Sequence, residues 1–137
     1  MTPAAKVHLT LAFLGGVEPE KAVGAARCVE GRSHRLRVDR VGYWRHNKIV
    51  WAGPHELPTA LRSLVESLHL HLYRAEYILE RRPYAAHVTL VRGAPRPREL
   101  RPLPKVEWPV DEFTLVRSTN SAGGSVYEVV ERFPLAA

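Results

Sequence analysis

Cysteine is nearly absent from this chain, since Cys28 is the only one among 137 residues. A single thiol excludes an internal disulfide framework and a zinc site built mainly from cysteines, and it favours a cytoplasmic location. Long apolar runs are absent as well. No stretch approaches the roughly 20 apolar residues that span a bilayer, and residues 1–6 do not have the pattern of a signal peptide. We therefore expect a chain that has no contact with a membrane.

Acidic residues are fewer than basic ones. The chain has 20 Lys and Arg against 14 Asp and Glu, which gives a formal net charge of +6 and a pI near 9.9. This balance favours a polyanionic partner, because basic side chains displace counterions from phosphates. Solvated basic surfaces explain the same charge, so the charge alone leaves both interpretations open. We expect one domain over residues 1–137, made of two small lobes.

Hydrophobic patterning predicts short strands and two helices. Apolar residues at three- and four-residue steps predict helices over 18–31, with Pro19 in the first turn, and over 57–73. We expect Phe13 and Cys28 to pack in the core. This pattern argues for the α+β class, with mainly antiparallel sheets. The predicted strands, which are β-rich runs bounded by Gly or Pro, cover residues 7–14, 36–41, 48–53, 84–91, 110–117 and 126–131, and a loop is expected at 94–104.

Two segments repeat one pattern of histidine, apolar residue, threonine and apolar residue. The first reads HLTL and begins at His8, and the second reads HVTL and begins at His87. Side chains two positions apart on a strand point to the same face. Each strand is therefore expected to present an imidazole and a hydroxyl together, the hydroxyls being those of Thr10 and Thr89. One such motif is common, whereas two copies in matching contexts indicate a site.

Two histidines and two threonines that meet across a cleft suit the hydrolysis of a phosphate ester. One imidazole takes a proton from an attacking water while the other gives a proton to the leaving oxygen. Threonine hydroxyls donate hydrogen bonds to the phosphate oxygens that carry charge in the transition state. No carboxylate or third histidine is spaced to complete a set of zinc ligands. The sequence therefore predicts catalysis without a metal or another cofactor.

At these residues the sequence resembles the 2H phosphoesterase superfamily, which is named for two such histidine motifs. Within it, the sequence is most similar to the bacterial and archaeal RNA 2',3'-cyclic phosphodiesterases, also known as RNA 2'-5' ligases. Residues 8–17, HLTLAFLGGV, resemble the first motif segment, and residues 80–93, ERRPYAAHVTLVRG, resemble the second. Similarity continues in KIVWAGP at 48–54 and from Val110 onward, so it covers nearly the whole chain.

The resemblance implies two lobes related by a pseudo-two-fold axis, with helices outside the sheets and an active-site cleft between the lobes. It implies metal-independent opening of a cyclic phosphate at an RNA end to a 2'-phosphomonoester, with His8 as the acid and His87 as the base. Thr10 and Thr89 would hold the phosphate, and Arg92 would add a charge-assisted contact. Family members usually have a strand and a helix before the first motif. Only seven residues precede His8, so the resemblance implies a first lobe that lacks part of its sheet.

Four further residues are candidates for contacts with RNA. Tyr43 and Trp44 lie in an aromatic and basic cluster that suits stacking on a terminal base, although ordinary packing explains Trp44 as well. Arg81 and Arg82 precede the second motif and suit contacts with the RNA backbone, with solvent exposure as the alternative. We expect RNA that ends in a 2',3'-cyclic phosphate as the partner, and a monomer or weak dimer as the oligomeric state.

Three other functions stay open at this point. The same site run in reverse would act as a 2'-5' RNA ligase. The same site would also suit an enzyme that hydrolyses small cyclic nucleotides and has no preference for RNA. A chain with a shortened first lobe would be an RNA-binding module with impaired catalysis. Hydrolysis of RNA ends is favoured over the binding module because all four motif residues are present.

Overall fold

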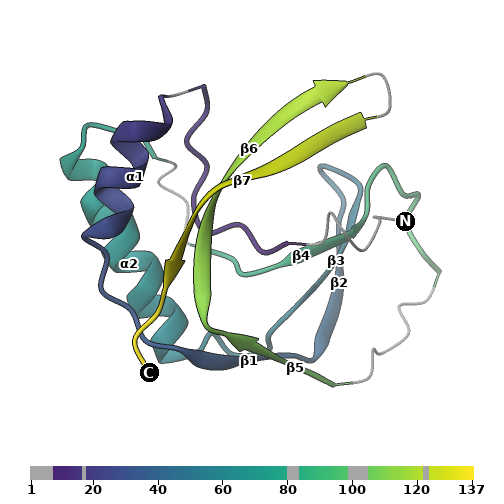
Figure 1. The fold of residues 1–137 in the computed structure, drawn as a ribbon. Coiled ribbons are helices and arrows are strands. Elements are labelled where there is room, and N and C mark those ends of the chain that lie inside the picture. The colour runs from purple at the N-terminus through teal and green to yellow at the C-terminus, as the bar shows by residue number, and fades with distance from the viewer. Residues whose placement is uncertain (1–7, 17, 80–83, 99–104, 122–123) are drawn as a thin grey trace. The chain divides into compact units, whose positions relative to one another are not determined.

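The computed structural model describes residues 8–16, 18–79, 84–98, 105–121 and 124–137. Within these residues the chain forms two helices and seven strands (Figure 1). The chain divides into two compact units. Unit 1 contains residues 1–11, 35–58 and 82–109, and unit 2 contains residues 12–34, 59–81 and 110–137. The elements in chain order are α1 (Pro19–Arg27), β1 (His34–Val38), β2 (Arg40–Trp44), β3 (Ile49–Gly53), α2 (Thr59–Arg74), β4 (Val88–Val91), β5 (Val106–Val110), β6 (Glu112–Ser121) and β7 (Gly124–Pro134).

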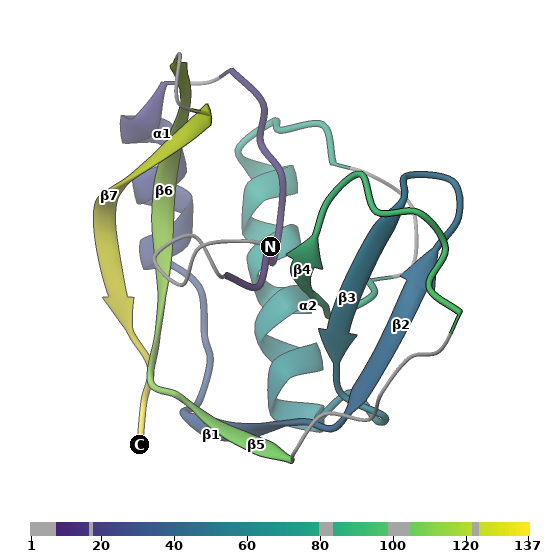
Figure 2. The same cartoon turned by 90° about the vertical axis from the view of Figure 1, so that its right-hand side faces the viewer.

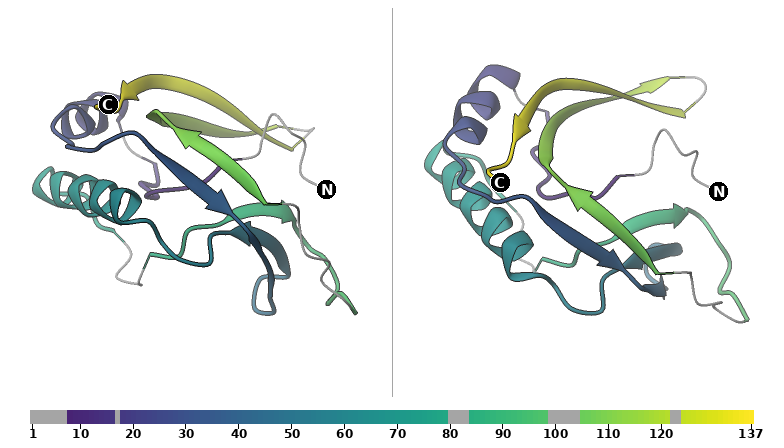
Figure 3. Two further views of the ribbon diagram at one scale, coloured as in Figure 1. Left: turned by 90° about the horizontal axis from the view of Figure 1, so that it is seen from below. Right: turned by 60° about the horizontal axis from the view of Figure 1, so that its bottom comes forward.

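The two helices of unit 2 lie side by side (Figure 3). Helix α1 begins with Pro19 at its first positions, where the missing N–H costs no hydrogen bond. Helix α2 turns one apolar stripe inward, and Leu64 on this stripe is fully buried. Burying one such side chain contributes roughly 1.5–3 kcal/mol, so the stripe accounts for much of the stability of unit 2. The buried residues of α2 are Leu61, Leu64, Val65, Leu68 and Leu72.

A long antiparallel hairpin of β6 and β7 completes unit 2 (Figure 1). Its register begins at Glu112 opposite Pro134, and one irregularity lies between Leu115 and Val116. The rings of Phe113 and Phe133 are cross-strand partners and stack with 5.0 Å between their centroids. This aromatic pair gives the hairpin an apolar contact of its own.

The main sheet of unit 1 has three strands in the order β2, β3, β4, and both pairs are antiparallel (Figure 2). One face of this sheet is buried: Ala52 of β3 is 2% exposed, and its partner Val88 of β4 is 5% exposed. The ladder between β3 and β4 shifts between Val50 and Trp51, which leaves one extra residue in β4. The other face carries the side chain of Thr89, from the second histidine–threonine motif.

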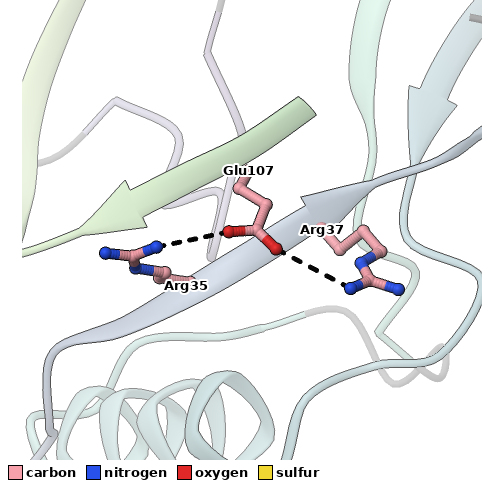
Figure 4. Close-up of polar contacts among 3 residues, drawn as sticks. All are labelled: Arg35, Arg37 and Glu107. Carbon is pink, nitrogen blue, oxygen red and sulfur yellow. Dashed lines mark hydrogen bonds and ion pairs between the residues drawn. The ribbon is translucent and has the colours of Figure 1, made fainter. Parts of the chain in front are cut away.

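Strands β1 and β5 form a separate two-stranded sheet. Glu107 of β5 lies between two arginines of β1, with its carboxylate oxygens 3.3 Å from Arg35 and 3.7 Å from Arg37 (Figure 4). All three side chains are at least half exposed. Such surface pairs contribute about 0–1 kcal/mol each, so they balance charge more than they stabilise the sheet.

Most predicted elements are confirmed. The α+β class and the antiparallel pairing agree with the structure. The helix predicted over 57–73 is α2, and the segment at 48–53 forms β3. The helix predicted over 18–31 is shorter, because α1 ends at Arg27. Strand β5 was not predicted, and it contains Pro109.

The strand predicted over 7–14 is wrong for the described residues. Only Leu9 pairs with a neighbouring strand, and the chain bends at Leu11. A strand needs ladder hydrogen bonds over successive residues, and the bend ends them. The strand predicted over 84–91 is likewise too long, since β4 begins at Val88. Neither motif histidine therefore lies within a regular strand: His8 comes before the isolated bridge at Leu9, and His87 comes directly before β4.

Two predicted core residues are exposed. Phe13 is 79% exposed, because the strand alternation that would have turned it inward is not present. Cys28 is exposed because it follows the last turn of α1, where its thiol lies 3.5 Å from the Gly24 carbonyl. Within the part of the chain that the structure describes, neither helix is long and apolar enough to cross a membrane.

Candidate active site

A backbone bridge joins the two histidine–threonine segments within unit 1. Leu9 and Val88 form an isolated antiparallel bridge. Residues on either side of an antiparallel bridge align in crossed order, and aligned residues share a face. The neighbours of the bridge therefore point to the face opposite Leu9 and Val88. In an antiparallel alignment that continues through this bridge, His8 would lie across from Thr89, and Thr10 across from His87.

The face that carries the four motif residues is accessible. Val88 lies on the opposite face and is 5% exposed, so the sheet turns its apolar side toward the core. Among the motif residues, His8 is exposed, and the other three are partly exposed. The register between β3 and β4 sets Trp51 opposite Thr89, so this indole shares the motif face. The arrangement presents two imidazoles and two hydroxyls to an incoming ligand.

A local hydrogen bond determines which ring nitrogen of His87 carries the proton in the neutral form. Its Nδ1 lies 2.9 Å from the carbonyl oxygen of Ala85. A carbonyl oxygen only accepts hydrogen bonds, so Nδ1 carries the proton and donates it. In the neutral ring, Nε2 is then the free acceptor. His87 is thus prepared to exchange a proton through Nε2.

A tryptophan of β2 contacts the His87 ring and is itself packed against a tryptophan of β3. Trp44 contacts His87 edge to face, with 4.5 Å between the ring centroids. Trp51 lies against Trp44 at 5.3 Å, with the rings tilted by 34°. Trp51 in turn covers its cross-strand partner Gly42 so closely that a Cβ at this position would overlap the indole. The chain needs glycine here because the ring occupies the space of any side chain. Arg40, two residues earlier, lies 5.5 Å above the Trp51 ring.

Tyr84 ties the second motif segment to the first. Its hydroxyl donates a hydrogen bond of 2.9 Å to the backbone carbonyl of Thr10. Burial raises the pKa of the Tyr84 hydroxyl well above its usual value, because the charged form would lose its hydration. The hydroxyl therefore stays protonated as a donor. It pins the backbone next to the Thr10 side chain.

The remaining predicted site residues are more dispersed. Arg92 follows β4 at a bend and is exposed. Tyr43 and Trp44 are neighbours on β2 and so point to opposite faces. Trp44 joins the motif face, whereas the Tyr43 hydroxyl donates to the Ala94 carbonyl at 2.8 Å. Arg81 and Arg82 lie outside the described residues.

Metal ligands were not expected from the sequence. Over residues 8–16, 18–79, 84–98, 105–121 and 124–137, no group of three or more His, Cys, Asp or Glu side chains has a geometry that could hold a metal ion.

Comparison with known proteins places the chain in a family. Residues 1–51 match the family described as LigT like Phosphoesterase. The RNA 2',3'-cyclic phosphodiesterase of Escherichia coli strain K12 is 34% identical over 138 residues, which cover 96% of this chain and 77% of the relative. This chain belongs to the LigT-like phosphoesterase family. A second member, the RNA 2',3'-cyclic phosphodiesterase of Thermus thermophilus, is 34% identical over 149 residues, covering 97% of this chain and 74% of the relative.

Solved structures of the LigT-like family share the fold. The crystal structure of E. coli LigT complexed with 3'-AMP has a TM-score of 0.91 at 31% identity, covering 98% of this chain and 80% of that one. The crystal structure of TT0787 from T. thermophilus has a TM-score of 0.81 at 29% identity, covering 98% and 80% of the two chains. The resemblance inferred from the two motifs is thus confirmed at the level of family and fold.

Sequence reasoning missed several residues that support this LigT-like site. The hydrogen bond from Tyr84 to the Thr10 backbone was not foreseen. Gly42 and Trp51 gave no signal as support for the histidine. The one available hint was the difference in size between these two residues, which are cross-strand partners in the hairpin.

Proposed function

We propose that this LigT-like chain is an RNA 2',3'-cyclic phosphodiesterase that opens cyclic phosphate ends to 2'-phosphomonoesters. One observation carries the proposal: Leu9 and Val88, which stand between the histidine and the threonine of each motif, form a backbone bridge. The curated relatives named RNA 2',3'-cyclic phosphodiesterase support the choice of substrate. So does E. coli LigT, for which structures with 3'-AMP and with phosphate are known.

The reaction moves two protons and exchanges one bond at phosphorus. A water oxygen attacks the phosphorus, and the bond from phosphorus to O3' breaks. We assign the water proton to Nε2 of His87, which is the free acceptor of the neutral ring because Nδ1 donates to Ala85. His8 supplies the proton that O3' needs to leave as a hydroxyl. The product keeps its phosphate on O2'.

Three further side chains are assigned to the phosphate. The hydroxyls of Thr10 and Thr89 donate hydrogen bonds to its non-bridging oxygens, which gain charge in the transition state. The Arg92 guanidinium adds a charge-assisted contact. Trp44 serves as support for His87 in this proposal, because its ring already contacts both His87 and Trp51. Base stacking and backbone contacts are assigned to Tyr43, Arg81 and Arg82 as sequence-based predictions.

The chemistry is proposed to need no metal, because imidazoles near neutral pH exchange both protons by themselves. A cytoplasmic location follows as a proposal from the single cysteine. The test is the incubation of purified protein with RNA that ends in a 2',3'-cyclic phosphate, in excess EDTA. The expected product is an RNA with a 2'-phosphate end. Absence of turnover by a folded protein contradicts the proposal. Turnover that EDTA abolishes contradicts its metal-independent form.

A further inference from the structure

The excess positive charge of the chain is concentrated in two segments of unit 1. Residues 40–53 and 84–98 contain six Lys and Arg and no Asp or Glu. The chain has 20 basic and 14 acidic residues, so 14 of each remain elsewhere and cancel. The whole formal charge of +6 therefore belongs to the β2–β3 hairpin and to β4 with its flanking residues. The six basic residues are Arg40, Arg45, Lys48, Arg92, Arg96 and Arg98.

Half of these basic side chains line one pocket. The pocket has a volume of about 520 Å³, within the range that small ligands occupy. Arg45, Arg96 and Arg98 are exposed and therefore open to a ligand. We call this site the arginine pocket, and its lining residues are Tyr43, Arg45, Arg96, Pro97 and Arg98.

Backbone hydrogen bonds build the wall of the arginine pocket. Gly93 has a φ of 66°, in the left-handed region that favours glycine, and it turns the chain after β4. The Ala94 N–H then donates a hydrogen bond of 3.0 Å to the Lys48 carbonyl, and the Ala94 carbonyl accepts one of 2.8 Å from the Tyr43 hydroxyl. Both bonds fasten the loop to the β2–β3 hairpin. The loop that carries Arg96 is thereby attached to the sheet.

The arginines are also partly pre-ordered by their neighbours. Proline fixes φ at positions 95 and 97 and favours an extended backbone at the residue before each of them. Arg96 thus lies between two restricted positions, which lowers the backbone entropy that it loses when a ligand binds. A flexible loop without these prolines would bind an anion less tightly.

The charge of the arginine pocket is not neutralised within the described residues. Some arginines elsewhere on the chain have carboxylate partners: Arg35 and Arg37 share Glu107 (Figure 4), and Arg132 pairs with Glu112 at 2.6 Å. No ion pair of the described residues includes Arg45, Arg96 or Arg98. Guanidinium groups without a carboxylate suit phosphate oxygens, which they bind through two parallel N–H donors.

The arginine pocket is separate from the reacting phosphate but close to it along β2. Tyr43 and Arg45 flank Trp44, which contacts His87. Side chains alternate along a strand, so Tyr43 points to the face opposite Trp44. Strand β2 is also the edge of its sheet. A single-stranded nucleic acid that reaches both positions would pass over this edge.

We propose that the arginine pocket binds a backbone phosphate of single-stranded RNA, one or more nucleotides away from the cyclic end. The proposal rests on the proposed function, because it assumes that the RNA end is bound at the histidines. A single-stranded chain is the ligand that the geometry favours, since it bends freely around an edge strand and carries one phosphate per nucleotide. The arginine pocket would then provide preference for RNA over small cyclic nucleotides.

The test compares two substrates and two matched double variants. The full-length variant R96Q/R98Q removes two charges from the arginine pocket, and R62Q/R74Q removes two exposed charges from α2. Each is assayed on a cyclic mononucleotide and on a longer RNA with a 2',3'-cyclic phosphate end. For R96Q/R98Q, we expect the KM for RNA relative to that for the mononucleotide to rise about tenfold. For R62Q/R74Q, we expect the wild-type ratio. If the ratio of the two KM values stays at the wild-type value for R96Q/R98Q, because both rise equally or neither changes, the proposal is overturned.

A binding measurement separates this proposal from the proposed function, because it needs no turnover. The affinity for the same RNA with a plain 3'-hydroxyl end is measured against salt concentration. Loss of the one phosphate contact should reduce the slope of log K against log salt by about 0.7 in R96Q/R98Q. If wild-type protein turns over neither substrate but this slope still falls, the proposed function fails and the RNA contact stands. If R96Q/R98Q weakens the binding of inorganic phosphate without changing that of RNA, the arginine pocket is a site for free anions and the proposal fails.

Discussion

The edge of the Trp44 indole and the His87 imidazole meet at a centroid distance of 4.5 Å, with 69° between the ring planes. Together with the bond from Nδ1 to the Ala85 carbonyl, this contact restricts the ring on two sides. A general base must be held within hydrogen-bond reach of the water that it activates. The support of His87 by a neighbouring strand therefore belongs to the proposed catalytic geometry, although Trp44 itself is assigned no proton.

The first prediction concerns this contact. Trp44→Leu keeps an apolar side chain but removes the ring surface against His87, so we expect kcat to fall about tenfold or more while KM changes little. Trp44→Phe restores an aromatic face and should recover part of the lost rate. Trp108→Leu, on β5, is the matched control. A fall in kcat for Trp108→Leu as large as that for Trp44→Leu would show a general loss of structure instead.

The second prediction concerns the two histidines. His8→Asn and His87→Asn should each lower kcat by about 10²–10⁴-fold, because each removes one proton transfer. The double variant should be little slower than the worse single variant, since both groups act in the same step. Rates on cyclic phosphate ends measure this directly, with the exposed His55→Asn as control. Wild-type turnover by either single variant is incompatible with the proposed pair.

The third prediction concerns Gly42. An alanine here would place its Cβ closer to the Trp51 ring atoms than van der Waals contact allows, so the ring must shift. We expect Gly42→Ala to lower the free energy of unfolding by about 1–3 kcal/mol and to lower activity as well, because Trp51 supports Trp44. Gly24→Ala is the control, since nothing lies within 4 Å of its added Cβ in α1. It should leave stability unchanged or raise it by up to about 1 kcal/mol. Urea unfolding measures both, and an equal effect of the two substitutions would contradict the close packing at Gly42.

The fourth prediction concerns Tyr84 and pH. Because burial raises the pKa of its hydroxyl, the folded protein holds this proton more tightly than the unfolded chain does. The resulting stabilisation is complete below the ordinary tyrosine pKa of 10.0 and is lost as pH rises through the higher folded value. Tyr84→Phe should therefore cost about 1 kcal/mol near neutral pH, from the lost bond to Thr10. As pH rises above the ordinary tyrosine pKa, the stability of Tyr84→Phe should also fall less than that of the wild type.

Urea unfolding at neutral pH and above the ordinary tyrosine pKa tests this expectation. The exposed Tyr73→Phe, on α2, is the matched control and should follow the wild-type curve. If Tyr84→Phe and Tyr73→Phe lose stability in parallel with the wild type as pH rises, the hydroxyl of Tyr84 does not carry the effect.

Local patterns in the sequence were enough for the helices, the class and the motif residues. The helix predicted over 57–73 agrees with α2, because a helical repeat depends only on residues three or four positions apart. The two motifs were recognised by the same kind of local spacing. The strand limits were less accurate at residues 7–14 and 84–91, because a strand ends where its partner does, and the partner lies elsewhere in the chain.

The sequence by itself determined which residues are the candidates for the chemistry: His8, Thr10, His87 and Thr89 stand in two matching patterns. Only the tertiary structure decided how they meet. A bridge joins Leu9 to Val88, the Tyr84 hydroxyl bonds the Thr10 backbone, and the Trp44 ring contacts His87. The physical reason is that spacing along the chain governs which face a side chain takes, whereas alignment between distant segments depends on hydrogen bonds and packing that form only on folding.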